Sequence, residues 1–423
     1  MRTYQPRILD TVLSTYLTGL PAIAIEGAKA VGKTSTAERL AAEVVLFDKA
    51  ETIELLRNGS ALLRQASKPV LLDEWQRYPP AWDIVRRLVD EDYSPGQYLL
   101  TGSAELPRNV NIHSGAGRIV RLRMRPLSLQ ERALEKPAIT LKSLLQDTPE
   151  KISARTDVAL TDYIEEILRS GFPGIRKSPD AFVELALDGY IDELLEKEFP
   201  ENGIYVRKPD VLRQWLRSYA AATGTTTSYQ KILDASTAGE DKKPAKQTTM
   251  AYRDALDALW VTDRIEAWLP SANAFAARGR APKHYLADPA LSARLLKLSR
   301  QELFSGTAKS ISPDNTVLGR LFESLVAQSL LVYAGVNRAR VYHFRTSRGD
   351  HEVDFIIEGG RRLLAIEVKT TADINSEDVR HLNWLEKQLP QKQLTKIVIT
   401  TGPYAYQRKE DGVLVIPAAL LGA

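Results

Sequence analysis

One eight-residue stretch near the amino terminus constrains this chain more than any other. Its two glycines, lysine and threonine have the spacing of a phosphate-binding loop, and its members are Gly27, Ala28, Lys29, Ala30, Val31, Gly32, Lys33 and Thr34. The apolar run 22–25 before it is typical of a buried strand, and the segment 35–42 after it is typical of a helix. Because the motif requires a strand, a loop and a helix in this order, the sequence predicts an α/β domain that binds a nucleoside triphosphate.

The residue types of this loop match the chemistry of phosphate binding. Glycines let backbone N–H groups close around phosphate oxygens. We expect Lys33 to reach the β and γ oxygens and Thr34 to place its hydroxyl on Mg²⁺. The alternative is a glycine-containing turn with a chance lysine, which the flanking strand and helix disfavour. ATP and Mg²⁺ are therefore the expected ligands.

Two further strand ends offer polar groups to the same site. One apolar run ends in Asp73, expected to hold Mg²⁺, and Glu74, expected to orient and deprotonate the attacking water. Another leads into Thr101 and Ser103, which are candidates for sensing the γ-phosphate. Ligands of open α/β sheets bind at the carboxyl ends of strands, so these ends are expected to converge. For the two acids, an exposed acidic turn is the alternative.

A basic strand follows at 119–125. Arg118, just before it, is expected to stabilise γ-phosphate charge in its own subunit or in a neighbour, as arginine fingers do. Arg121, Arg123 and Arg125 alternate with apolar residues and so share one face. For these three we expect a solvated basic face.

Composition limits the class of protein. A chain of 423 residues is too long for one ordinary core and should divide into two to four domains. No apolar run reaches the roughly 18 residues needed to cross a bilayer, and the first residues lack a secretory apolar stretch. We therefore expect a cytoplasmic protein with no membrane partner.

The content of cysteine and histidine argues against several kinds of site. Zero cysteines exclude disulfides, thiolate metal sites and cysteine nucleophiles. The histidines lack the paired spacing of a zinc site, and we expect solvent or core roles for His113, His284, His343, His351 and His381. The net charge of +4 is mild, so nucleic-acid binding has to rest on local patches.

The middle of the chain is predicted to be helical. Apolar stripes at helical spacing fill 136–205, which we expect to be a connector rather than a catalytic unit. After it, three helix-like segments precede two strand-like ones, the order of a winged helix; they are 211–222, 228–235, 248–260, 265–269 and 284–286.

Several polar residues of this region are candidates for DNA contact. Those of the third helix that could face a groove are Thr248, Thr249, Tyr252 and Arg253, and those in or beside the wing that could meet phosphates are Arg278, Arg280 and Lys283. The turn 238–247 is longer than a winged helix usually has. Winged helices also dock proteins, so a structural or docking use stays open.

A second cluster of chemistry-bearing residues lies near the carboxyl end. Two strand-like runs are joined by a glycine turn, as in a hairpin. Because side chains alternate along strands, Asp354 is expected to face Glu367 and Lys369. The two acids suit Mg²⁺, and the lysine could orient a water or offset charge at a scissile phosphate. The alternative is a hairpin whose polar face carries salt bridges.

Together these motifs resemble prokaryotic AAA-type ATPases that carry a C-terminal region of undefined function. The resemblance rests on the phosphate loop, Leu72-Asp73-Glu74, Leu100-Thr101-Gly102-Ser103, Gly117-Arg118, Arg125-Pro126-Leu127-Ser128 with Glu131, and the segments 170–173 and 282–288. It implies a winged helix followed by a PD-(D/E)XK nuclease-like fold. The resemblance implies that Asp354, Glu367 and Lys369 match the catalytic motif of that fold. Glu323 matches the acidic residue of its first helix and is expected to be a further metal ligand, and Glu352 is an extra acid.

The expected fold class is α/β, with an AAA-type P-loop ATPase domain, a helical connector, a winged-helix-like domain and a PD-(D/E)XK nuclease-like domain at 1–135, 136–205, 206–305 and 306–423. The expected function is an Mg²⁺-dependent ATPase that couples ATP hydrolysis to engagement of DNA, with a C-terminal site for DNA cleavage. The alternative is a nucleotide-dependent switch that docks a partner protein or regulates transcription, with the nuclease-like domain as a scaffold. Self-association is also expected, because AAA-type ATPases often complete their sites across subunits.

Overall fold

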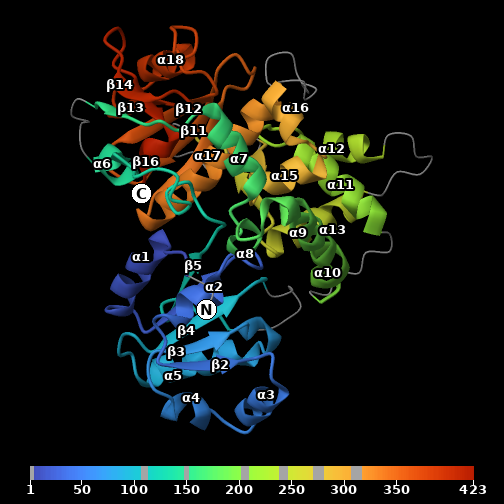
Figure 1. Ribbon diagram of the computed structural model, residues 1–423. Helices are drawn as coiled ribbons and strands as arrows, with labels where there is room; N and C mark the ends of the chain where they lie inside the picture. Colours follow the sequence, from blue (N-terminus) through green and yellow to red (C-terminus); the bar gives the residue numbers. More distant parts are fainter. Residues whose placement is uncertain are drawn as a thin grey trace.

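The structure is a computed structural model that describes residues 4–105, 113–146, 152–201, 209–237, 246–269, 281–305 and 317–423, without the side chains of 246–249. Figure 1 shows the amino-terminal sheet at one end of the molecule, the carboxyl-terminal sheet at the other, and the middle helices beside both.

The amino-terminal sheet has five parallel strands in the order β2-β3-β4-β1-β5. Their bounds are β1 Ala22–Glu26, β2 Glu43–Leu46, β3 Val70–Asp73, β4 Tyr98–Gly102 and β5 Ile119–Arg123. The helices around it are α1 Ile8–Leu17, α2 Lys33–Glu38, α3 Ala50–Arg57, α4 Ala61–Gln65 and α5 Pro80–Glu91. Because β4 lies between β1 and β3, the three strands predicted to carry site residues are neighbours.

Alternation along these strands sends side chains into two separate cores. Ala22 and Ala24 of β1 pack under α3, α4 and α5. Ile23 and Ile25 face the other way, into a core shared with α1 and with helices of the middle region. One face of the nucleotide-domain sheet is therefore covered by residues that lie far along the chain.

The middle region is helical with one antiparallel strand pair, β8 and β9. Its elements are α6 Leu141–Gln146, α7 Leu160–Arg169, α8 Pro173–Arg176, α9 Asp180–Glu193, the π-helical turn η2 Leu194–Glu198, α10 Phe199–Glu201, α11 Pro209–Ala221, α12 Tyr229–Ser236, α13 Lys246–Ala258, β8 Thr262–Ile265, β9 Lys283–Leu286, α15 Pro289–Leu295 and α16 Arg300–Ser305. The first strand of this pair begins three residues before the predicted run 265–269.

The carboxyl-terminal region holds a seven-stranded mixed sheet in the order β10-β11-β12-β13-β15-β14-β7. Its elements are α17 Val317–Val336, β10 Arg340–Arg345, β11 Glu352–Glu358, β12 Leu363–Lys369, α18 Arg380–Gln388, β13 Leu394–Thr400, β14 Tyr404–Gln407, β15 Leu414–Pro417 and β16 Leu421–Gly422. Strands β10, β11 and β12 are antiparallel, whereas β12, β13 and β15 are parallel.

Two short strands of the connector belong to this end of the molecule. Strand β7 (Ala154–Arg155) extends the carboxyl-terminal sheet beside β14, and β6 (Ile139–Thr140) pairs with β16. The first part of the connector is therefore built into the carboxyl-terminal region.

Helix α17 is, within the described ranges, the one helix long and apolar enough to cross a membrane by length and composition. However, 78% of its most apolar window is buried inside the protein. Its apolar side chains pack into the core that also contains residues of α7, β11 and β12.

Candidate functional site

The phosphate-binding loop joins the end of β1 to the start of α2. A side chain at Gly27 would place its Cβ 2.1 Å from the carbonyl oxygen of Met124, so this position tolerates no larger residue. Gly32 has a φ of +99°, in the left-handed region that glycine adopts without strain. Both glycines of the motif are therefore required by the backbone itself.

Lys33 is buried at the centre of the loop. Its Nζ donates hydrogen bonds of 2.9 Å to the carbonyl oxygens of Gly27 and Ala28. Burial lowers the pKa of Lys33 to about 8, although Glu74 and Asp73 act in the opposite direction. The ammonium thus lies inside the loop that is predicted to receive the phosphates.

The side chains at the strand ends converge, as predicted. Thr34 Oγ1 donates a 2.7 Å hydrogen bond to Asp73 Oδ1, and Thr101 Oγ1 donates to the same oxygen. Hydroxyl and carboxylate oxygens are the ligands that Mg²⁺ prefers, so the pair formed by Thr34 and Asp73 fits this ion.

Glu74 extends from the same strand end in a left-handed conformation, with a φ of +55°. Ser103 Oγ donates a 2.8 Å hydrogen bond to Glu74 Oε2, and Gln76 Nε2 donates both to Glu74 and, at 3.0 Å, to Ser103 Oγ. Thr101 and Ser103 are thus hydrogen-bonded to the two acids, and their role in sensing the γ-phosphate stays a prediction. The role of Gln76 was not evident in the sequence, because it lies outside the strand-end pattern.

A cavity of about 350 Å³ opens at these side chains. Asp73, Glu74, Ser103 and Lys29 line it together with Glu198 and Glu201, which come from η2 and α10 of the middle region. The connector was predicted to have no catalytic part, yet it supplies two carboxylates to the cavity wall. Sequence spacing gave no signal for this, because the acids lie far from the loop in the chain.

Lys29 links the phosphate-binding loop to these acids. Its Nζ pairs with Glu198 and lies 3.4 Å from Glu193 Oε1. The Lys29 pKa is raised because the ion pairs with Glu198 and Glu193 outweigh the lowering effect of burial. The loop is therefore tied electrostatically to the end of α9 and to η2.

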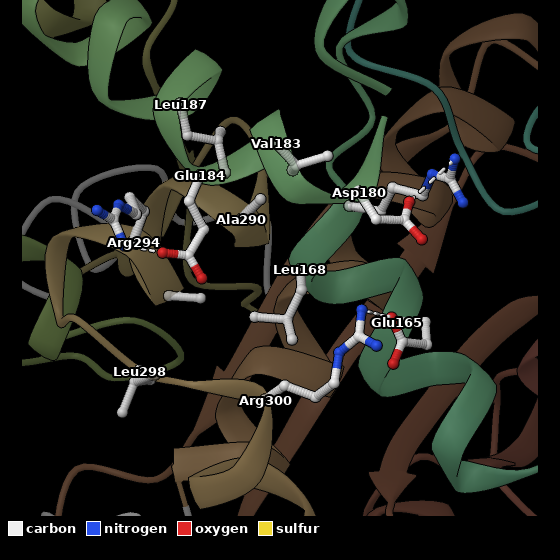
Figure 2. A pocket seen from close by; sticks show the side chains of 12 residues that line it. Glu165, Leu168, Asp180, Val183, Glu184, Leu187, Ala290, Arg294, Leu298 and Arg300 are labelled. Atoms are coloured by element: carbon white, nitrogen blue, oxygen red, sulfur yellow. Dashed lines mark hydrogen bonds and ion pairs between the residues drawn. The ribbon is translucent and has the colours of Figure 1, made fainter. Parts of the chain in front are cut away.

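Figure 2 shows a second, smaller hollow between the helices of the middle region. Leu168, Val183 and Leu187 provide apolar side chains, while Arg294 pairs with Glu184 and Arg300 pairs with Glu165. Its volume of about 80 Å³ is far below the few hundred Å³ of typical ligand pockets. The cavity at the phosphate-binding loop is the better candidate for a nucleotide.

The prediction that Arg118 acts on a phosphate in its own subunit is wrong. Strand β5 pairs in parallel with β1, Ile119 lying opposite Ala22, so Arg118 is at the edge of the sheet opposite the phosphate-binding loop. Five strand residues separate the edges by about 16 Å. Arg118 Nε instead lies 2.5 Å from Asp90 Oδ1. A role in a neighbouring subunit stays a prediction.

Of the three arginines of β5 and its continuation, Arg121 is exposed as expected, whereas Arg123 and Arg125 do not form a solvated face. Arg121 lies over the Trp82 ring and 3.4 Å from Glu26 Oε1. Arg123 and Arg125 both pair with the buried Asp263 of β8, at 3.0 and 3.1 Å. For Arg123 and Arg125 the expectation failed because Asp263 lies about 140 residues away in the chain, beyond any local pattern.

The predicted C-terminal residues do gather. Asp354 on β11 accepts a hydrogen bond of 2.9 Å from the Val368 backbone N–H of β12. Lys369 Nζ lies 3.3 Å from Glu367 Oε2. Glu323 of α17 joins them through a fifth residue, Lys283 of β9, whose Nζ lies 2.8 Å from Glu323 Oε1 and 2.8 Å from Asp354 Oδ1. We call these five residues the acidic cluster.

Burial and charge act differently on the acids of the acidic cluster. Burial raises the pKa of Glu323 to about 7, and it raises that of Glu367 well above its usual range, with the charge of Asp354 adding to the effect. Loss of solvent alone would raise the pKa of the partly buried Asp354 as well, but the ammonium groups of Lys283 and Lys369 hold it below the ordinary value. Within the described residues, no group of three or more acids, histidines or cysteines is arranged to hold a metal ion.

Two expectations about DNA contacts from the middle region are wrong. Lys283 is 1% exposed at its side chain and pairs with acids, so its ammonium does not reach a phosphate outside the protein. Tyr252 is buried against the helical core. Arg253 pairs with Asp254 and lies over the Tyr229 ring. Arg278, Arg280 and the side chains of Thr248 and Thr249 lie outside the described residues.

Two histidines form a contact that sequence spacing did not reveal. His351 Nδ1 and His381 Nδ1 are 3.1 Å apart, and the His351 ring stacks on Trp384 with centroids 4.0 Å apart. His284 has the expected core role, and burial lowers its pKa to about 4. The pair was missed because 30 residues separate its members in the chain.

Comparison with protein families identifies the amino-terminal segment. Residues 20–133 match a family model described as "AAA domain". These residues form a P-loop ATPase domain. Residues 160–302 and 318–421 match models described as "Domain of unknown function (DUF8612)" and "Domain of unknown function (DUF4143)".

Individual relatives are distant. Uncharacterized proteins of Mycobacterium bovis and Mycobacterium tuberculosis are each 24% identical over 360 residues, which is 83% of this chain and 71% of theirs. Among solved structures, a Walker-type ATPase of Pyrococcus abyssi has a TM-score of 0.41 at 15% identity, covering 69% of this chain and 96% of its own. The ORC2 protein of Aeropyrum pernix, in ADPNP–ADP complexes, has a TM-score of 0.34 at 16% identity, covering 73% and 98%.

Proposed function

We propose that the chain is an Mg²⁺-dependent ATPase whose hydrolytic site is the cavity at the phosphate-binding loop. The observation that carries this proposal is the convergence of Lys33 and Thr34, at the start of α2, with Asp73 and Glu74, at the end of β3. Thr34 and Asp73 would hold Mg²⁺, which supplies charge neutralisation at the β- and γ-phosphates when bound.

Different residues of the site have different roles in hydrolysis. Lys33 exchanges its two carbonyl partners for phosphate oxygens, which are stronger acceptors for an ammonium. Glu74 orients a water for attack and accepts its proton, while Ser103 and Gln76 hold the carboxylate in place. Thr101 keeps Asp73 oriented towards Thr34.

Two variants test this assignment. Lys33→Ala is expected to weaken triphosphate binding, whereas Glu74→Gln is expected to bind ATP and to lose about 10²-fold to 10⁴-fold in turnover. Steady-state hydrolysis with Mg²⁺ and with EDTA, together with equilibrium nucleotide binding, separates the two effects. Normal turnover in both variants would remove this site from consideration.

We further propose that the middle region contains a winged helix and that the carboxyl-terminal region is a PD-(D/E)XK nuclease-like domain. The order α11, α12, α13, β8, β9 supports the first assignment. The order α17, β10, β11, β12, α18, β13 and the gathering of Asp354, Glu367 and Lys369 support the second. The chain would use ATP turnover in a cytoplasmic role, to engage either DNA or a partner protein, as a single chain or as a homo-oligomer.

One observation favours the protein-docking switch over the nuclease. Lys283 pairs with two acids of the acidic cluster, and an acid already paired with an ammonium is a poor ligand for Mg²⁺. The discriminating measurement is ATP turnover with and without supercoiled, linear and branched DNA. Stimulation by DNA would support nucleic-acid engagement; turnover indifferent to DNA, together with a stable protein partner, would support the switch.

A further inference from the structure

A fully buried ammonium lies among the carboxylates of the acidic cluster. Lys283 Nζ is 2.8 Å from Glu323 Oε1 and 2.8 Å from Asp354 Oδ1 of the cluster, and 3.5 Å from Oε1 of Glu352, which lies beside the cluster on β11. These acids come from α17 and β11, whereas the lysine comes from β9 of the middle region. One cation thus joins oxygens that belong to two different parts of the chain.

The position of this ammonium is the one that a metal ion would use. An ammonium has three N–H donors, and here three carboxylate oxygens surround it. A small divalent cation is also held by several carboxylate oxygens that converge on one point. Nζ therefore occupies the point at which the acids of α17 and β11 meet.

The converging oxygens of the cluster are already occupied. Glu323 Oε1 contacts Lys283 Nζ and also accepts from Tyr285 OH, while Asp354 contacts Nζ through Oδ1 and accepts from the Val368 N–H through Oδ2. Glu367 Oε1 is buried and has no hydrogen-bond partner. A divalent ion at the point where Glu323 and Asp354 meet would have to displace the ammonium, so the residues do not fit a metal there while Lys283 is in place.

We propose that Lys283 is the resident cation of the acidic cluster, and that the cluster binds a divalent ion only when this ammonium is removed. The proposal goes beyond the proposed ATPase function and is independent of ATP turnover. It also implies that the cluster stays free of metal as long as the pair β8–β9 remains docked against α17 and β11.

The charges of the cluster agree with this inference. Lys283 and Lys369 face three carboxylates, those of the buried Glu323 and Glu367 and of the partly buried Asp354. Burial raises the pKa of Glu323 and Glu367, which favours a proton on one of them as the third positive charge. Removing the Lys283 ammonium leaves carboxylates uncompensated, and a divalent cation would restore the balance.

The competing explanation is that Lys283 forms a purely structural ion pair at a place that never binds metal. Titration of the full chain with Mn²⁺, without nucleotide, distinguishes this explanation from the proposal. Free Mn²⁺ is followed by electron paramagnetic resonance in the wild type, Lys283→Met, Lys283→Arg, and Lys283→Met combined with Asp354→Asn. We expect Lys283→Met to bind one more equivalent of Mn²⁺ than the wild type. The double variant and Lys283→Arg are expected to lose that equivalent, which excludes the phosphate-binding loop as its source.

The proposal is overturned if a folded Lys283→Met variant binds no more Mn²⁺ than the wild type. It is also overturned if the wild type itself binds an equivalent of Mn²⁺ that is lost when Asp354→Asn is introduced alone. If Lys283→Met unfolds without metal, recovery of its thermal transition with Mn²⁺ supports the proposal. If it stays unfolded with Mn²⁺, the variant Lys283→Gln, which removes the ammonium but keeps a polar side chain and every acid, decides. One extra equivalent then supports the proposal, and none overturns it.

Discussion

At the scale of single residues, Lys33 links the loop's geometry to pH. The folded protein lowers its pKa from the ordinary value of 10.5 to about 8 through burial. Between these pH values the unfolded chain holds a proton that the folded chain has lost. The contribution of Lys33 to folding stability therefore rises as pH increases through this window.

Nucleotide binding should show the opposite trend. A triphosphate prefers the charged ammonium, so ATP affinity is expected to fall as pH rises above about 8. From pH 7 to pH 9 the expected loss is about tenfold, since each pH unit above the pKa removes about nine tenths of the charged form. Equilibrium binding of ATP across this range measures it, with Lys33→Ala as the control that should lack the trend. An ATP affinity that stays unchanged up to pH 9 in the native protein would contradict the assignment of Lys33 as a phosphate ligand.

Residue patterns predicted the local part of each site and missed the distant part. Alternation along β11 and β12 correctly brought Asp354, Glu367 and Lys369 together, because strand geometry fixes which side chains share a face. Lys283 was misassigned to a DNA-facing surface, because its partners lie 40 and 71 residues along the chain. No periodicity within one element can reveal such a contact.

At the scale of elements, η2 places a carboxylate where a triphosphate has to enter. Glu198 lines the nucleotide cavity and pairs with Lys29 of the phosphate-binding loop. A buried carboxylate repels phosphate oxygens, and its pairing withdraws a cation from them. The end of the connector is therefore expected to oppose nucleotide binding.

Replacing this carboxylate should tighten binding. Glu198→Gln is expected to lower the Kd of ATP about threefold to tenfold, which corresponds to roughly 1 kcal/mol of like-charge repulsion removed. Calorimetric titration of ATP into proteins that also carry Glu74→Gln measures this Kd, because that substitution suppresses hydrolysis during the experiment. The matched control is Glu196→Gln, in the same turn but exposed, which should leave Kd unchanged. Weaker binding in Glu198→Gln would mean that this acid helps to hold the nucleotide.

Strand β8 contributes a second contact between elements. Asp263 is fully buried, and although burial alone would raise its pKa, Arg123 and Arg125 hold that pKa below its ordinary value. A lowered carboxylate pKa adds stability that is present above the unfolded pKa and is lost as pH falls through the folded one. The contact should therefore weaken in acid.

Removing this charge should be costly. Asp263→Asn leaves two arginines without their shared partner, and the free energy of unfolding is expected to fall by about 3–5 kcal/mol. Chemical denaturation measures it, with Asp254→Asn as the control. Asp254 pairs with Arg253 at the surface, where the loss should stay below about 1 kcal/mol. Equal losses in the two variants would show that burial of the Asp263 pair has no energetic weight.

At the scale of the whole molecule, the predicted connector does not pack as one unit, because its two halves belong to different hydrophobic cores. Leu141, Tyr163 and Ile167 of its first half pack with α17 and the carboxyl-terminal sheet. Phe172 and Leu187 of its second half pack with Ile23 and Ile25 of the nucleotide-domain sheet. Composition and periodicity predicted helices here, but they contain no information on which element the apolar face of each helix packs against.

This shared core predicts that residues 1–135 do not fold independently. Without the middle helices, the face of the sheet that carries Ile23, Ile25 and Leu99 loses its cover beyond α1 and α2. Exposed apolar surface of this kind favours aggregation or a loosely packed state. The isolated fragment is expected to bind a hydrophobic dye and to lack a cooperative thermal transition, whereas the full chain shows one.

The corresponding point variant tests the same contact in the intact chain. Phe172 is completely buried against this sheet although it lies outside residues 20–133, and Phe172→Ala is expected to cost about 3–5 kcal/mol. Hydrogen exchange should then report lost protection in β1 and β4 of the nucleotide domain as well as in the middle helices. Exchange that increases only in the middle helices, or a fragment 1–135 that unfolds sharply near the full chain's transition, would show two independent cores. The nucleotide site and the middle region would then communicate through polar contacts such as Lys29 with Glu198, rather than through a common core.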